Sequence, residues 1–160
     1  METSRRIKLH AGCVYGLAML VAASYCVLKS SPPSGIAWGV ALASTVSSGA
    51  LGYFFGGWYT PVGGERPSFE LVAVPLSISI LAPVLGAGLF LLSAIIFSQP
   101  GLQDGVLWVA PMAVAMTLAY FTVAWPVAIP VFVLAGAVLG VRSWRGSNES
   151  FKPTSLRDAA

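Results

Sequence analysis

The chain has 160 residues and a mean hydropathy of +0.80, with 56% hydrophobic and only 9% charged side chains. A soluble domain carries about 25% charged residues, so this composition excludes a chain whose folded surface is covered by water. Most of the basic residues lie near the two ends, without the interleaved aromatic residues of a nucleic-acid-binding face. We therefore expect a lipid bilayer, and no nucleic acid, as a partner.

Three uncharged gaps and one further apolar run are each long enough to cross a membrane. Asp, Glu, Lys, Arg and His are absent from residues 30–64, 71–103 and 105–141, and an apolar run covers Leu9–Leu28. A helical crossing needs about 20 apolar residues. We predict an all-α integral membrane protein, a four-helix transmembrane bundle within residues 1–142, with spans over residues 9–28, 36–58, 69–97 and 111–141.

The first predicted span follows a basic segment that contains Arg5, Arg6 and Lys8. Such a segment before an apolar run is also typical of a secretory signal, and Val21-Ala22-Ala23 offers a cleavage site after Ala23. Cleavage would leave three spans without changing their direction. Retention of the first span is the preferred interpretation.

The second predicted span carries small residues four apart, and the first and fourth spans show the same spacing. Residues at this spacing share one helix face, and a face of small side chains lets another helix approach closely. The face either packs the four helices on each other or docks a partner or second copy, most favourably through Ser44–Gly56. The candidate helix-packing or partner-face residues are Gly12, Gly16, Ser44, Ser48, Gly52, Gly56, Gly136 and Gly140.

Prolines interrupt the third and fourth predicted spans. Pro75 and Pro83 lie in the third span, and Pro126 and Pro130 lie in the fourth. Each proline removes a backbone donor from the helix and its ring clashes with a preceding carbonyl. We therefore expect both spans to be kinked.

The last apolar stretch, residues 106–141, is too long for one straight crossing. A helix of this length would extend about 54 Å, whereas the bilayer core is about 30 Å thick. One interpretation is a single tilted helix that starts near Pro111, with residues 101–110 as a loop or short interfacial segment. The other divides the stretch at Trp125-Pro126 into two spans, which would place the C-terminal basic residues outside. The single helix is preferred.

The positive-inside rule gives the direction of the spans. With the N-terminus inside, only Lys29 lies outside, and Trp58 and Tyr59 mark the inner end of the second span as headgroup anchors. We expect a bacterial inner-membrane protein with both termini in the cytoplasm and a flexible cytoplasmic tail over residues 143–160. The basic residues then placed inside are Arg5, Arg6, Lys8, Arg66, Arg142, Arg145, Lys152 and Arg157.

The pattern of polar residues argues against membrane chemistry. No ionisable residue lies in the interior of a predicted span, as a proton relay, an ion-coupled carrier or a voltage sensor would require. His10 is the single histidine, so neither a multi-histidine metal or haem site nor a Ser–His–Asp triad is available. We expect no enzymatic activity, no metal and no cofactor.

Two functions fit these expectations. The first is contact between helices of this chain and a membrane partner, as an accessory or assembly subunit, or as an immunity protein against a membrane-acting toxin. The immunity interpretation is an analogy at the level of architecture. The alternative is a small oligomeric channel or carrier for a neutral solute, built around the serine-rich face of the second span.

Overall fold

All residues that the structure describes are helical. The structure is a computed structural model that describes residues 2–29, 35–59, 70–97 and 103–150. In chain order the helices are α1 (Glu2–Lys29), α2 (Gly35–Phe55), the 3-10 turn η1 (Gly56–Tyr59), α3 (Glu70–Phe97), α4 (Gln103–Ala119), the π-helical η2 (Tyr120–Ala124) and α5 (Trp125–Ser150).

Four of the helical segments are long and apolar enough to cross a membrane, which confirms the prediction of a multi-pass all-α protein. Their outward faces carry large aliphatic side chains, as a lipid-facing surface requires; Leu28 is 72% exposed and Leu134 is 64% exposed. The four segments are Ser4–Lys29, Gly35–Tyr59, Leu71–Ile96 and Ala113–Arg142.

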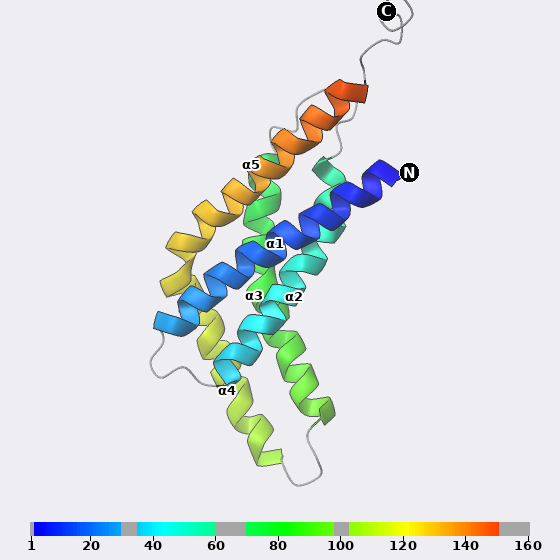
Figure 1. Ribbon diagram of the computed structural model, residues 1–160. Helices are drawn as coiled ribbons and strands as arrows, with labels where there is room; N and C mark the ends of the chain where they lie inside the picture. The colour runs from blue at the N-terminus through cyan, green and yellow to red at the C-terminus, as the bar shows by residue number, and fades with distance from the viewer. Residues whose placement is uncertain (1, 30–34, 60–69, 98–102, 151–160) are drawn as a thin grey trace, which may run out of the picture.

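The helices form one bundle in which α1 packs along α2, with α3 and α5 completing the core. Figure 1 shows the start of α1 and the end of α5 at the same end of the bundle. The centre of the core contains the fully buried side chains of Tyr15, Met19, Ile78 and Phe132. Cleavage after Ala23 would remove Tyr15 and Met19 from this core.

The fourth span is a single helical path that changes direction at η2. Figure 1 shows α4 and α5 meeting at an angle there. The backbone N–H of Trp125 donates to the carbonyl of Tyr120, five residues earlier, so this turn is wider than an α-helical turn. π-helical turns are a known cause of sharp bends. Because of this bend, residues 106–141 can form one continuous helical path, although they are too many for one straight crossing of the bilayer.

The helical path is longer than the predicted span 111–141, although its membrane-crossing part, Ala113–Arg142, lies close to the predicted bounds. Residues 103–110 are helical and continuous with α4, and Pro111 lies inside that helix instead of near its start. α5 continues to Ser150, so residues 143–150 are helix, while residues 151–160 lie outside the described part of the chain. A proline is tolerated inside a membrane helix where neighbouring groups satisfy the carbonyl it leaves free, so Pro111 need not end α4.

The remaining prolines also lie within helices. Pro75 and Pro83 are inside α3, Pro130 is inside α5, and Pro126 directly follows the residue that closes the π-helical turn. Their role as the cause of kinks in the third and fourth spans stays a prediction.

Candidate functional site

The small residues of α1 and α2 bring the two helix backbones into contact. A Cβ atom added to Gly12 would lie 3.0 Å from the carbonyl oxygen of Gly49, and one added to Gly52 would lie 2.8 Å from that of Ala11. A Cβ atom added to Gly16 would lie 3.7 Å from the Cα atom of Gly49. A side chain at Gly12 or Gly52 would therefore force the helices apart, whereas a Cβ atom at Gly16 would make an ordinary van der Waals contact.

The same contact continues beyond the end of α2 into η1. A Cβ atom on Gly56 would lie 2.9 Å from the Cα atom of Lys8 and 2.9 Å from the Cβ atom of Ala11. α1 therefore covers the small-residue face of α2 from the middle of the bundle to the end where the N-terminus lies.

The glycines of α5 pack against α3. A Cβ atom on Gly136 would lie 2.5 Å from Cγ of Pro75 and 3.0 Å from the carbonyl oxygen of Leu71. One on Gly140 would overlap the Leu71 side chain. Gly136 therefore accepts no side chain without a shift of α3, whereas at Gly140 a rotation of the flexible Leu71 side chain could make room.

Ser44 meets α3 on a different part of the α2 surface. A Cβ atom on Gly86 would overlap Ser44, at 2.5 Å from its backbone nitrogen. Ser44, Ser48, Gly52 and Gly56 are all buried. In this structure the Ser44–Gly56 face is therefore covered by α1 and α3 of the same chain.

Three hydroxyl groups of α2 donate hydrogen bonds to backbone carbonyls within the bundle. Ser48 Oγ donates to the carbonyl oxygen of Tyr15 at 2.9 Å and so links α2 to α1. Thr45 and Ser47 instead donate at 2.9 Å to carbonyls of their own helix, four residues earlier. The latter use is the common one for hydroxyls in helices.

Tyr15 is the residue at which most elements meet, and sequence analysis did not single it out. Its hydroxyl is hydrogen-bonded to that of Tyr59 in η1, and its ring stacks on Phe132 of α5 at 5.8 Å between centroids. Tyr59 is fully buried, so its prediction as a headgroup anchor is wrong. A tyrosine inside an apolar span could have indicated this contact from the sequence, because a buried phenol usually has a hydrogen-bond partner.

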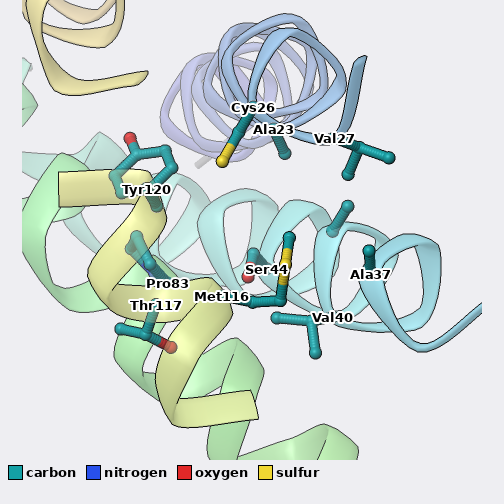
Figure 2. Close-up of a pocket in the computed structure, with 11 residues that line it drawn as sticks. Ala23, Cys26, Val27, Ala37, Val40, Ser44, Pro83, Met116, Thr117 and Tyr120 are labelled. Carbon is teal, nitrogen blue, oxygen red and sulfur yellow. The ribbon is translucent and has the colours of Figure 1, made fainter. Parts of the chain in front are cut away.

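A small cavity of about 20 Å³ lies where all four spans meet. Figure 2 shows its lining, which comes from α1, α2, α3, α4 and η2. Such a volume holds about one water molecule. The lining is uncharged, and its side chains with polar or sulfur atoms are Cys26, Ser44, Met116, Thr117 and Tyr120.

Two buried donors have no hydrogen-bond partner within the described part of the chain. They are the hydroxyl of Tyr120 and Nε1 of Trp125, which lie at the two ends of the π-helical turn. Leaving a buried donor unsatisfied costs about 1–3 kcal/mol. π-helical turns are frequent at functional sites, so the combination makes this region a candidate ligand site.

Neither a cluster of metal-binding residues in the described part of the chain nor a similar known protein indicates what this site binds. Within the four described ranges, no group of three or more His, Cys, Asp and Glu residues is placed to hold a metal ion. Comparisons of the chain with known protein families, with curated proteins and with solved structures find no match. The function is therefore argued from the arrangement of the residues alone.

Proposed function

We propose that this chain is a non-enzymatic membrane protein that acts by helix–helix contact with a membrane partner. The partner would be another membrane protein or a second copy. The roles that fit are an accessory or assembly subunit, or an immunity protein that recognises a membrane-acting toxin.

The observation that carries this proposal is a cluster of exposed aromatic side chains at one end of α2. Phe54 is 80% exposed, Trp58 is 58% exposed and Tyr53 is 42% exposed. Phe55 supports this cluster, because its ring lies edge-on to those of Phe54 and Trp58, at 6.4 Å and 5.4 Å between centroids. Large aromatic side chains are enriched at the centres of protein interfaces.

The aromatic cluster is open to a partner, whereas the small-residue face of α2 is covered. The small-residue face of α2 is buried against α1 and α3, whereas Phe54 projects away from the bundle. Trp and Tyr alone would also suit a headgroup belt. An exposed Phe braced by a second aromatic ring is better suited to contact with another helix.

Photo-crosslinking in cells tests this surface. With p-benzoylphenylalanine in place of Phe54, we expect a crosslinked protein product, because an interface residue lies within reach of its partner. The same substitution at Leu42, which is 57% exposed in the first half of α2 and away from the aromatic cluster, is the matched control. A product of twice the chain mass identifies a second copy as the partner. Absence of any protein product from Phe54, or equal products from both positions, contradicts the proposal.

We also propose that the protein lies in a bacterial inner membrane with both termini in the cytoplasm. Arg5, Arg6 and Lys8 begin α1, Arg142 lies toward the end of α5, and Figure 1 shows these two ends together. Lys29 is at the other end of α1. This distribution supports the proposed direction under the positive-inside rule.

Reporter fusions test this direction. Alkaline phosphatase, which is active only outside the cytoplasm, should be active when fused after Lys29 and inactive when fused after Ala160. Green fluorescent protein fused after Ala160 should be fluorescent. Active phosphatase at Ala160 would contradict the proposed topology.

A second candidate function is a small oligomeric channel or carrier for a neutral solute. The observation in its favour is that Ser44 lines the uncharged cavity between the four spans. An oligomeric pore around the serine-rich face is less well supported, because Ser44 and Ser48 face neighbouring helices of the same chain.

A further inference from the structure

Among the basic side chains that the structure describes, only that of Lys8 is partly buried. Two glycines of η1 make room for it. A Cβ atom on Gly56 would lie 2.9 Å from the Cα atom of Lys8, and one on Gly57 would lie 3.2 Å from its Cε atom and 3.9 Å from Nζ. The aliphatic part of the lysine therefore packs along η1, as lysine side chains do when only the ammonium group stays in water. This contact holds the ammonium group beside η1.

A second cation lies on the same face of α1. Arg5 precedes Lys8 by three residues, so the two side chains are neighbours on the helix surface. Like charges at neighbouring positions of a helix repel each other, and an anion between them removes this repulsion. Arginine and lysine both bind phosphate, arginine through its planar fork of donors and lysine as a point charge. The pair is therefore suited to a phosphate group.

The sequence segments at this end of the bundle carry more basic than acidic residues. Figure 1 shows the start of α1 beside η1, with the end of α5 at the same end of the bundle. The basic residues of the segments that begin, connect or end there are Arg5, Arg6, Lys8, Arg66, Arg142 and Arg145, and the acidic residues are Glu2, Glu65, Glu70 and Glu149. This balance favours an anionic ligand.

The two cations lie where the apolar surface of the bundle begins. Leu9, which directly follows Lys8, is 51% exposed, and Leu17 further along α1 is 63% exposed. Trp58, which directly follows Gly57, is 58% exposed, and indole rings prefer the level of the lipid headgroups. A ligand that uses both surfaces has a phosphate group and a long apolar part, which is the chemistry of a phospholipid.

We propose that Arg5 and Lys8 form a binding site for the headgroup of one anionic phospholipid. The phosphate accepts hydrogen bonds from the guanidinium and ammonium groups, and the acyl chains contact the exposed aliphatic side chains of α1. The positive charge selects a headgroup with a net negative charge over a zwitterionic one. This site goes beyond the proposed contact with a membrane partner and does not depend on it.

Native mass spectrometry of the full chain in detergent tests this site. The probes are phosphatidylglycerol, which is anionic, and phosphatidylcholine with identical acyl chains. We expect the first phosphatidylglycerol molecule to bind about ten-fold more tightly than phosphatidylcholine. Inorganic phosphate at the same concentration should not displace it, because it has no acyl chains. Equal affinity for the two lipids, or displacement by inorganic phosphate, overturns the proposal.

Removal of one charge at either end of α1 makes the result specific. Lys8→Gln should weaken the binding of phosphatidylglycerol about five-fold and leave that of phosphatidylcholine unchanged. Lys29→Gln is the matched control, because Lys29 is exposed at the other end of α1, 6.0 Å from the centre of the Tyr25 ring. It should change neither affinity. No effect of Lys8→Gln, or equal effects of the two variants, overturns the proposal.

A second pair of variants tests the position of the ammonium group without a change of charge. Gly57→Leu fills the space along which Lys8 packs and should weaken phosphatidylglycerol binding as much as Lys8→Gln does. Gly35→Leu is the control, because no atom lies within 4 Å of a Cβ added at Gly35, at the other end of α2. An unchanged affinity of Gly57→Leu, with the circular dichroism spectrum of the parent, overturns the proposal.

Discussion

Replacement of Tyr15 by alanine is expected to lower the free energy of unfolding by about 3–5 kcal/mol. The change removes a fully buried ring that stacks on Phe132, and it deletes the hydroxyl that is bonded to Tyr59. Loss of the ring leaves a void where α1, η1 and α5 meet, and the surrounding atoms lose their packing partners. Unfolding in mixed micelles, followed by tryptophan fluorescence, measures the effect.

Tyr53→Ala is the matched control for this experiment. Tyr53 is 42% exposed on α2 and does not belong to the core around Tyr15. We expect its replacement to change stability by about 0.5 kcal/mol or less. If Tyr15→Ala and Tyr53→Ala were equally stable, Tyr15 would not be the central contact of the bundle.

Replacement of Gly86 by alanine is the second change with a large expected effect. The added Cβ atom would overlap Ser44 and lie 2.5 Å from its backbone nitrogen, so α2 and α3 must separate. Overpacking of this kind costs about 1–3 kcal/mol. The conflict is with backbone atoms, which cannot move aside as a flexible side chain can.

Gly88→Ala provides the matched control within the same helix. No atom lies within 4 Å of a Cβ added at Gly88, and the residue is exposed. Because alanine favours a helix over glycine by about 1 kcal/mol, this variant should be as stable as the parent or more stable. The same unfolding titration compares the two. Equal destabilisation by both variants would show that helix propensity, rather than contact with Ser44, decides the result.

The number and type of the spans could be predicted because they depend on a long-range composition signal. Gaps without charge longer than 30 residues leave few alternatives to a membrane helix. The end of the helix that contains the fourth span was less predictable than the span itself. Residues 143–150 are polar, yet they continue α5, because a helix can extend past the bilayer boundary without any change in its backbone pattern.

The partners of the small-residue faces could not be predicted from spacing. Spacing shows that Gly52 and Gly56 share a face, but it does not show which helix that face contacts. The structure assigns them to α1. The hydrogen bond between Tyr15 and Tyr59 was missed for the same reason, since it joins residues 44 positions apart.

The cavity and the π-helical turn could not be predicted from the sequence, for a different reason. The cavity is lined by residues from five elements, whose packing the sequence does not show. The π-helical turn is a local change of helical repeat at Tyr120–Ala124, and the residues there show no pattern that distinguishes it from an α-helical turn. Pro126 marks the region, but a proline does not specify which kind of turn precedes it.

The π-helical turn also decides which side of α5 faces the bundle. A helix advances about 100° per residue, so the extra residue in this turn sets the rotation of everything that follows. Deletion of one codon within residues 120–124 would turn Phe132, Gly136 and Gly140 away from Tyr15 and α3 together. The contacts of Gly136 and Gly140 with α3 therefore depend on the extra residue of the π-helical turn as well as on the glycines themselves.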